Sequence, residues 1–464
     1  MTIGRMDFQQ QAAPPARTHD ALAVALGNAS LLGVGYLLAG RRKLAVFTGI
    51  VTVLLVVLLG TTFRTGWFEL VVLLWWLALT AHGWLLAGGR AQRIKVRRER
   101  SIALGVALPV LVLVGLIRVD SAMIGSSVTE ARGNGDCAQA LTALNQVWFA
   151  HYVVDAPMTV EGDATVRACQ WLKATKSKFT VALTGDVESM KAGFQGLAGL
   201  RGELPGHEKM ADVVLDGFFG GLPSKEPCDT LSITDALRAE KLSGSEADRS
   251  AHAVARVEPA ALIGCGDKLM TTQSWAAART RYEQLLSQYP GTEFTARAQD
   301  GIKRATLAIE LAHVRSLGKN YCSKPAAYSG AAPYGPGTNR SVVYGDNTYV
   351  YTSKFPAEWI TTDIGDAVLV LCAGDKDYGA QVKTCAYRNQ GTNARENISF
   401  HNIAIPLTAY ELRTGKPVFQ TTVEIGGTSC PFFVPGSEVN ASSQSYVTPS
   451  DDQVREAFSY VVNE

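Results

Sequence analysis

No cysteine occurs among the first 136 residues, whereas the rest of the 464-residue chain contains eight. This even number, confined to one part of the chain, is typical of a disulfide framework in an oxidising compartment. No Cys-x-x-Cys pair occurs, and the seven histidines are scattered singly, so the ligand spacing of a metal site is lacking. We therefore expect neither a metal site nor a cofactor. The cysteines are Cys137, Cys169, Cys228, Cys265, Cys322, Cys372, Cys385 and Cys430.

Acidic residues are scarce in the first 125 residues, which contain 13 Lys and Arg but 5 Asp and Glu, a net charge of +8. The remaining residues contain 31 basic and 37 acidic side chains, a net charge of −6. A basic, apolar first part joined to a mildly acidic second part is typical of a membrane protein with an exported domain. The cations lie at the ends of hydrophobic stretches and not on a soluble face with interleaved aromatics, which argues against a nucleic-acid partner.

Four apolar stretches predict a helical membrane domain over residues 21–125, after a polar tail of residues 1–20. Each is close to the roughly 20 residues that cross a bilayer core of about 30 Å. The stretches are 21–40, 44–63, 68–89 and 101–117. Trp67 and Trp84 suit anchoring at the membrane interface, whereas Trp75 and Trp76 lie deep enough to pack against other helices.

The basic loops predict the orientation of these stretches. The densest cluster consists of Arg90, Arg93, Lys95, Arg97, Arg98 and Arg100. Because loops rich in Lys and Arg stay cytoplasmic, we expect this loop and Arg41–Lys43 inside the cell and the turn Arg64–Trp67 outside. The chain beyond the fourth stretch then lies outside the cytoplasm, at the cell surface or in a periplasm, which agrees with the distribution of cysteines.

The first stretch permits two interpretations. It contains Asn28 and Ser30, and its segment Gly33-Val-Gly-Tyr-Leu-Leu-Ala-Gly-Arg resembles a Gly-x-Gly-Tyr-Leu-x-x-Gly-Arg segment of several families of small bacterial membrane proteins. A full crossing would place the N-terminus outside, although the polar tail has no secretory signal. A re-entrant or interfacial helix would leave three crossings and a cytoplasmic N-terminus.

Residues 126–320 are rich in Ala and Leu at helical spacing, and they predict an exported helical domain with a tandem duplication of about 90 residues. In both halves a Pro-Gly pair, at Pro205 and Pro290, separates two helical patterns, because proline ends one helix before the next begins. Two cysteines lie 32 residues apart in the first half and 37 residues apart in the second. The duplication therefore predicts the equivalent bridges Cys137–Cys169 and Cys228–Cys265.

The second half, at about residues 274–310, resembles a tetratricopeptide-like helical pair. The resemblance implies packing positions where small residues let helices touch and aromatic residues fill the groove. In this chain these positions are Ala278, Tyr282, Leu285, Tyr289, Pro290, Ala296 and Ala298. Such repeats stack into concave surfaces that bind peptides or proteins, so the resemblance implies a partner of this kind. An ordinary helix pair inside a bundle is the alternative.

A linker of residues 321–340, rich in Pro, Gly, Ala and Tyr, precedes a predicted β domain of residues 341–464. Strands are expected at 341–343, 348–352, 367–372, 381–388, 398–404, 409–412 and 417–423. Thr414-Gly-Lys indicates a hairpin turn, and Pro449-Ser-Asp-Asp starts a final helix near Asp451–Val462. Many short strands favour a sandwich or a small barrel. The expected bridges are Cys372–Cys385 and, by elimination, Cys322–Cys430.

No catalytic constellation stands out in this domain. Asp363 and Asp366 precede a strand and Asp375 and Asp377 share a turn, but their spacing lacks the calcium-loop pattern. His401 stands alone among strand residues, and no serine has the context of a nucleophile elbow. We therefore expect no catalytic residue. Five tyrosines form either a recognition face or ordinary strand positions: Tyr344, Tyr349, Tyr351, Tyr378 and Tyr387.

The sequence thus favours a membrane-anchored extracytoplasmic binding, receptor or scaffold protein for a protein, peptide or envelope ligand, and not an enzyme. One alternative is an exported hydrolase with its site at the junction of the helical and β domains, which requires a desolvated carboxylate pair or a Ser/His couple. Another is an accessory subunit of a membrane transport complex, which requires a polar cavity around His82 and Thr80. The sequence identifies neither the ligand nor the oligomeric state.

Overall fold

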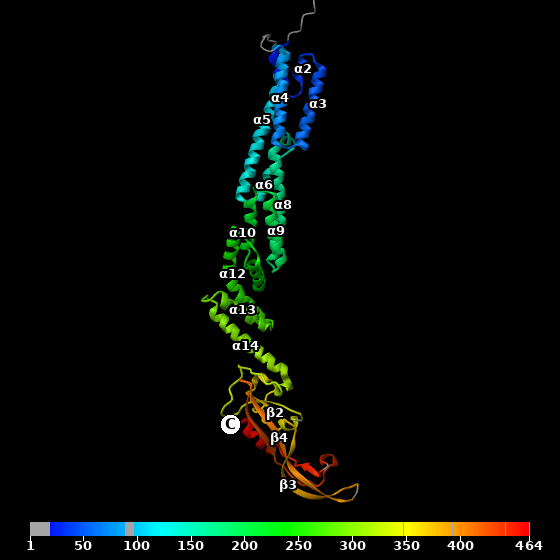
Figure 1. The fold of residues 1–464 in the computed structure, drawn as a ribbon, viewed down its shortest axis with the longest axis vertical. Coiled ribbons are helices and arrows are strands. Elements are labelled where there is room, and N and C mark those ends of the chain that lie inside the picture. The colour runs from blue at the N-terminus through cyan, green and yellow to red at the C-terminus, as the bar shows by residue number, and fades with distance from the viewer. Residues whose placement is uncertain (1–18, 89–96, 347, 392, 441, 464) are drawn as a thin grey trace, which may run out of the picture. The chain divides into compact units, whose positions relative to one another are not determined.

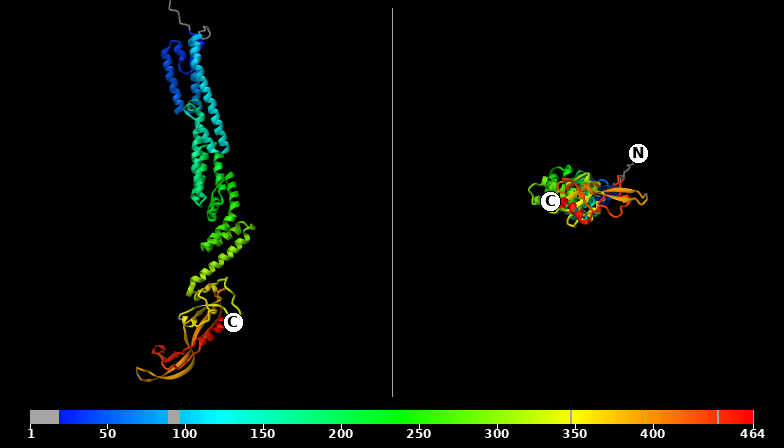
Figure 2. Two further views of the ribbon diagram at one scale, coloured as in Figure 1. Left: turned by 180° about the vertical axis from the view of Figure 1, so that it is seen from behind. Right: turned by 90° about the horizontal axis from the view of Figure 1, so that it is seen from below.

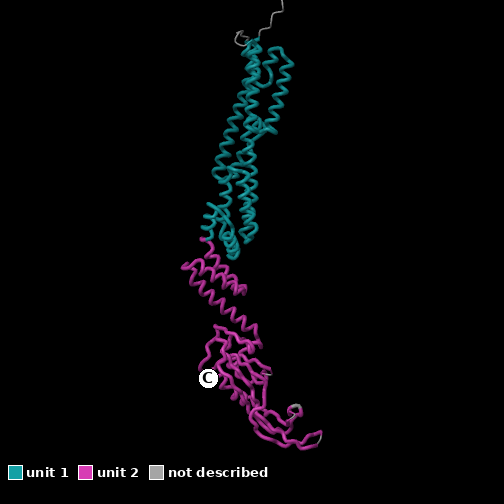
Figure 3. Tube along the Cα trace, viewed as in Figure 1, with its two compact units in different colours: residues 1–254 teal, residues 255–464 magenta. Residues whose placement is uncertain are grey.

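The chain forms two compact units in the computed structural model, which describes residues 19–88, 97–346, 348–391, 393–440 and 442–463. Unit 1 comprises residues 1–254 and unit 2 residues 255–464 (Figure 3). The division falls within the predicted helical region 126–320. Most of the predicted polar tail and three cations of the predicted basic loop, Arg90, Arg93 and Lys95, lie outside the described residues.

Three helices of unit 1 are long and apolar enough to cross a membrane (Figure 1). They are α3 (Arg42–Thr61), α4 (Gly66–Leu86) and α5 (Arg97–Asn134). They match the second, third and fourth apolar stretches, but α5 continues well beyond residue 117, where its apolar stretch was expected to end. Its 38 residues extend about 57 Å at the rise of an α-helix. The helix is therefore nearly twice as long as a bilayer core of about 30 Å is thick.

The first apolar stretch is not one helix. It consists of α1 (Ala21–Ala29) and α2 (Val34–Leu38), and between them Leu31 and Gly33 have left-handed φ angles of 62° and 68°. These two residues turn the chain, so neither helix approaches the roughly 20 residues of a crossing. The alternative of a continuous span over 21–40 is therefore wrong.

The break between α1 and α2 is held by hydrogen bonds to the middle of α4. The buried Asn28 amide nitrogen donates to the carbonyl oxygen of Leu79 at 3.1 Å, and the Asn28 amide oxygen accepts from the backbone N–H of Tyr36 at 3.2 Å. The Trp76 indole N–H donates to the carbonyl oxygen of Ala29 at 2.9 Å. The predicted packing role of Trp76 thus corresponds to a contact that positions the break.

The part of unit 1 that follows α5 is also mainly helical. Its helices are α6 (Cys137–Leu144), α7 (Phe149–Val154), α8 (Ala156–Ala182), α9 (Val187–Glu203), α10 (Glu208–Gly220), α11 (Pro227–Ala239) and the first part of α12 (Gly244–Thr271). Cys137 of α6 is bonded to Cys169 of α8, which confirms that predicted bridge. Cys228 and Cys265 are also disulfide-bonded, and their bond to each other stays a prediction.

In unit 2, α13 (Trp275–Gln288) and α14 (Thr295–Leu317) pack with the end of α12 around one aromatic ring. The fully buried Tyr282 lies between two glycines, since a Cβ atom would come 2.4 Å from its ring at Gly266 and 2.6 Å from it at Gly301. The Tyr282 hydroxyl donates to Asp267 at 2.7 Å. Burial raises the pKa of Tyr282 above its ordinary value, so the hydroxyl remains a donor.

We expect Gly301→Ala to lower the free energy of unfolding by about 1–3 kcal/mol, because the new methyl group would overlap the Tyr282 ring. Hydrogen–deuterium exchange of α13 peptides in the full-length protein would measure the effect as faster exchange. Gly217→Ala in α10 is the matched control, since a Cβ atom there has no neighbour within 4 Å. Equal exchange rates in the Gly301→Ala variant and the parent protein would contradict this packing.

Unit 2 ends in a mixed six-stranded sheet built around one long strand, β4 (Arg395–Glu411). The C-terminal half of β4 pairs with β2 (Leu369–Ala373) and β5 (Lys416–Ile425), and its N-terminal half pairs with β3 (Asp377–Arg388) and β6 (Gln444–Tyr446). β1 (Ser341–Tyr344) joins β2 in parallel. The predicted sandwich or barrel is therefore wrong, because the strands share one central strand and form no second sheet within the described residues.

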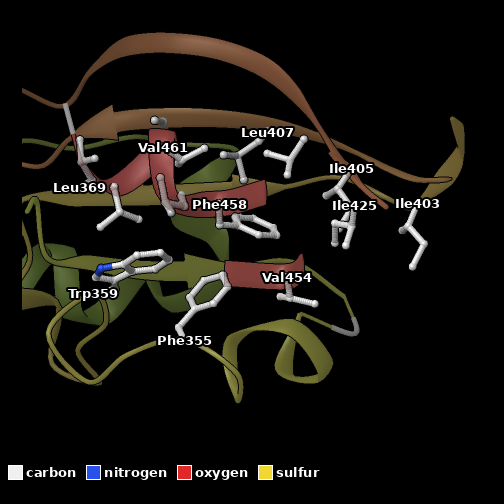
Figure 4. Close-up of a cluster of buried hydrophobic side chains, with 14 residues drawn as sticks. Phe355, Trp359, Leu369, Ile403, Ile405, Leu407, Ile425, Val454, Phe458 and Val461 are labelled. Atoms are coloured by element: carbon white, nitrogen blue, oxygen red, sulfur yellow. The ribbon is translucent and has the colours of Figure 1, made fainter. Parts of the chain in front are cut away.

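The main core of this domain lies between the sheet and α16 (Asp451–Val462) (Figure 4). Figure 2 shows α16, in red, beside the sheet. Ser450 and Gln453 form a capping box at its start, so the predicted final helix is confirmed. The ring centroids of Phe458 and Phe355 are 4.9 Å apart, and those of Phe355 and Trp359 are 5.8 Å apart.

Three predicted strands need correction. Residues 348–352 contain the short helix α15 (Tyr349–Thr352), because the hydroxyl and carbonyl oxygens of Thr348 make local turn bonds that start a helical turn. The predicted strands 398–404 and 409–412 are parts of one strand, β4, which ends at Glu411. Short 3₁₀ turns occur at η2 (Gly318–Cys322), η3 (Ile364–Asp366) and η4 (Gly436–Glu438).

The two predicted bridges of the β domain are also wrong. The bonds are Cys322–Cys372 and Cys385–Cys430. Cys372 on β2 lies opposite Thr408 of β4, whereas Cys385 on β3 lies opposite Ile398. Ten residues of strand separate these two positions, roughly 33 Å, which is far beyond the reach of one disulfide.

Candidate functional site

Two adjacent phenylalanines stand out on the surface of the β domain. Phe432 is 105% exposed and Phe433 58% exposed, in the segment that connects β5 to β6. Adjacent exposed aromatic residues commonly mark an interaction site, because large apolar surface is costly to leave in water. The next residue, Val434, turns inward and packs on a small core formed by Ile398, Phe400 and Val447.

The chain is fixed to the sheet immediately before the two phenylalanines. Cys430, with a left-handed φ of 60°, is bonded to Cys385 of β3. The Tyr387 hydroxyl donates to the carbonyl oxygen of Pro431 at 2.7 Å. Burial raises the pKa of Tyr387, so this hydroxyl keeps its proton at neutral pH. A surface fixed on both sides is preorganised, since little conformational entropy remains to be lost when a partner binds.

A second aromatic group joins side chains of β3 and β6, which both pair with β4. Tyr378 stacks on Tyr446 with 4.3 Å between ring centroids and 10° between planes. The Lys376 ammonium lies 4.5 Å from the centroid of Tyr446, a cation–π geometry. Burial raises the pKa of both tyrosines. His401, which the sequence leaves alone among strand residues, is 9% exposed and donates to the carbonyl oxygen of Gly379 at 3.0 Å.

The five tyrosines considered as a recognition face do not share one face. Tyr344 and Tyr351 pack on different cores of the domain, and Tyr387 packs on the small core near Val434. Tyr378 is in the stacked pair. Tyr349 is strongly exposed, at 80%. The alternative of ordinary structural positions therefore fits four of the five.

The acidic residues of the β domain lie in separate places. Asp363 pairs with Arg315 of α14 at 3.1 and 2.5 Å, and hydrogen bonds from Arg315 lower the pKa of Asp363. Asp366 belongs to the turn η3, and Asp375 and Asp377 are exposed. Among the residues that the structure describes, no three His, Cys, Asp or Glu side chains are arranged to hold a metal ion.

The seven positions of the tetratricopeptide-like pair differ in their burial. Ala278, Tyr282, Leu285 and Ala298 are fully buried, Tyr289 is half-buried, and Pro290 and Ala296 are exposed. A packing role for Pro290 and Ala296 is therefore wrong. Ala298 lies on the buried face of α14. Ala296 lies two residues earlier, about 200° around the helix, and therefore on the exposed face. Pro290 lies in the turn between α13 and α14.

The residues named for a transport pathway have local partners. The ring Nδ1 of His82 lies 2.7 Å from the Tyr36 hydroxyl, and the Thr80 hydroxyl donates to the carbonyl oxygen of Leu77 at 2.8 Å. His82 therefore helps to hold α2 against α4.

Sequence reasoning does not single out Phe432 and Phe433. The available signal is the segment Cys430-Pro-Phe-Phe-Val-Pro, in which two aromatic residues stand between prolines outside any strand pattern. Aromatic residues usually indicate a core, and only the structure shows that these two point away from it.

No protein-family model, curated protein or solved structure matches the chain.

Proposed function

We propose that this chain is a membrane-anchored extracytoplasmic binding protein, a receptor or scaffold that presents its β domain to a protein partner. Helices α3, α4 and α5 cross the membrane, and the disulfide-bonded remainder lies outside the cytoplasm. Two sequence features support this orientation, namely the dense cations around the start of α5 and the absence of cysteine before residue 137.

In this proposal α1 and α2 enter the membrane from the cytoplasmic side and leave on the same side. Their break contacts Trp76, which lies ten residues before the end of α4 at Leu86. Ten helical residues rise about 15 Å, half of a bilayer core of about 30 Å. The re-entrant interpretation of the first stretch therefore fits the depth of this contact.

The observation that carries the binding function is the fixed, exposed pair Phe432–Phe433. Fixed aromatic side chains are the residues that most often dominate the free energy of protein association. The junction of α14 with the sheet, where the alternative hydrolase would have its site, is filled by the buried residues Val314, Tyr321 and Val370. Burial raises the pKa of Tyr321 to about 12, far from that of a general acid or base at neutral pH.

A photoreactive phenylalanine at position 432 of the full-length protein tests the binding function in cells. We expect a protein adduct of defined mass. We further expect the added substitution Phe433→Ser to weaken its formation by roughly 30-fold, since loss of a dominant contact costs about 2 kcal/mol.

The matched control places the same photoreactive residue at Tyr460, an aromatic position of α16 that is 55% exposed in the same domain. Adducts that form equally at positions 432 and 460, or that persist in the Phe433→Ser variant, would contradict a specific surface. Adducts to lipid alone would assign these residues to a membrane surface instead of a protein partner.

A further inference from the structure

A cavity of about 350 Å³ lies among α3, α4 and α5, within the range of small-molecule sites. Ala29 and Leu31, at the break between α1 and α2, line one end of it, and Val153 and Val154 of α7 line the other. If α1–α2 fill the inner half of the membrane as proposed above, the cavity occupies the outer half, where a continuous first helix would have packed.

The outer end of the cavity is held by α7, which belongs to the chain after the predicted membrane domain. The ring of His151 is fully buried. Its Nδ1 accepts from the backbone N–H of Trp148 at 3.1 Å, and its Nε2 donates to Asp120 of α5 at 2.9 Å. Trp148 and Phe149 are 56% and 72% exposed at the start of α7. Exposed aromatic residues at this position suit the membrane–water interface, so the outer end of the cavity lies at the level of lipid headgroups.

The cavity wall is apolar apart from Glu69 and Arg118. Apolar walls of this kind favour the binding of apolar molecules. Three lining residues, Leu73, Leu111 and Val114, are 42–52% exposed, so the cavity opens to the surroundings of the helices. Within a bilayer these surroundings are lipid chains.

The polar end carries one cation and two carboxylates. Arg118 donates to Glu69 at 3.0 Å and lies 3.3 Å from Asp155, while Glu69 also accepts from the backbone N–H of Ala156 at 2.9 Å. The Arg118 side chain remains 47% exposed, against about 20% for both carboxylates. The guanidinium thus has free donors for a phosphate, and the cluster has one negative charge in excess.

We propose that this cavity binds one acyl chain of an outer-leaflet phospholipid whose headgroup carries an ammonium group. The chain fills the apolar space, the phosphate accepts from Arg118, and the ammonium lies against the second carboxylate, so that this headgroup adds no net charge to the cluster. A headgroup with negative charge alone would raise the excess from one negative charge to two and would give the second carboxylate no cation. The proposal rests on the membrane topology proposed above and not on the partner of Phe432.

Native mass spectrometry of the full-length protein, released from nanodiscs of phosphatidylethanolamine and phosphatidylglycerol with the same chains, tests this site. We expect one retained phosphatidylethanolamine molecule. Val114→Trp, which fills the cavity, should reduce the retained fraction about ten-fold, whereas Leu113→Trp, at a neighbouring 57% exposed position outside the cavity wall, should not. Asp155→Asn removes the carboxylate that the ammonium faces and should weaken the preference for the ammonium lipid.

Equal retention in the two Trp variants would overturn the site, and equal retention of both lipids by the parent protein would overturn the headgroup assignment. Photoreactive acyl chains provide a measurement that needs no variant. They should label peptides of α4 and α5 near Leu73 and Leu111, and labelling confined to other helices would equally overturn the proposal. Protease digestion of spheroplasts distinguishes a failure of lipid binding from a failure of the proposed membrane orientation. If the chain after residue 134 is protected from the protease, the orientation itself is wrong.

Discussion

Gly35→Ala is expected to displace the α1–α2 segment and to lower the stability of the full-length protein by roughly 3 kcal/mol or more. A Cβ atom at Gly35 would lie 2.0 Å from the carbonyl oxygen of Val24 and 2.5 Å from the amide oxygen of Asn28. Neither atom can move away easily. The Val24 oxygen belongs to the backbone of α1, and the Asn28 side chain is hydrogen-bonded to the carbonyl oxygen of Leu79 in α4. The midpoint of thermal unfolding of the protein in nanodiscs measures the loss.

Gly49→Ala in α3 is the matched control, because a Cβ atom there has no neighbour within 4 Å. Asn28→Leu tests the polar half of the same contact. It keeps the volume but removes one of the two acceptors of the Tyr36 N–H, which also donates to the carbonyl oxygen of Gly33 at 3.1 Å. The expected cost is about 0.5–1.5 kcal/mol, that of one hydrogen bond. If Gly35→Ala and Gly49→Ala unfold at the same temperature, the close approach of α1 and α2 is absent and the broken first stretch must be rejected.

Sequence patterns predict those helices and strands whose ends are determined by residues nearby in the sequence. The apolar stretches predict α3 and α4, and Pro449-Ser-Asp-Asp predicts the start of α16, where Ser450 and Gln453 form a capping box. The break at Leu31 is different, because its left-handed backbone is compensated by hydrogen bonds from Trp76 and Asn28 to distant partners. No local pattern contains those partners.

The sheet shows the same limit. Pro406 lacks an N–H donor, and the sequence around it predicts two short strands. β4 runs through Pro406 because its missing donor falls where β2 ends opposite Leu407 and β3 begins opposite Ala404. Phe432 and Phe433 escape prediction for a related reason, since their exposure depends on Cys430 being held by a distant strand.

Loss of the Cys322–Cys372 bridge is expected to destabilise unit 2 by about 4 kcal/mol, because the bond closes a loop of 50 residues. The double variant Cys322→Ala and Cys372→Ala removes this bridge and leaves Cys385 bonded to Cys430. Both removed cysteines flank the core in which Tyr321 packs on Val342, so the loss should appear there first. Faster hydrogen–deuterium exchange in β1 and β2 of the full-length protein measures it.

The control tests the alternative pairing that the sequence predicts, Cys372–Cys385 and Cys322–Cys430. Tryptic cleavage after Lys376 and Lys383 separates Cys372 from Cys385, so peptides mapped without reduction distinguish the two pairings directly. We expect one linked pair containing Cys322 and Cys372 and another containing Cys385 and Cys430. A Cys372–Cys385 pair would require β2 and β3 to lie side by side, and it would overturn both the register along β4 and the fixed position of Phe432.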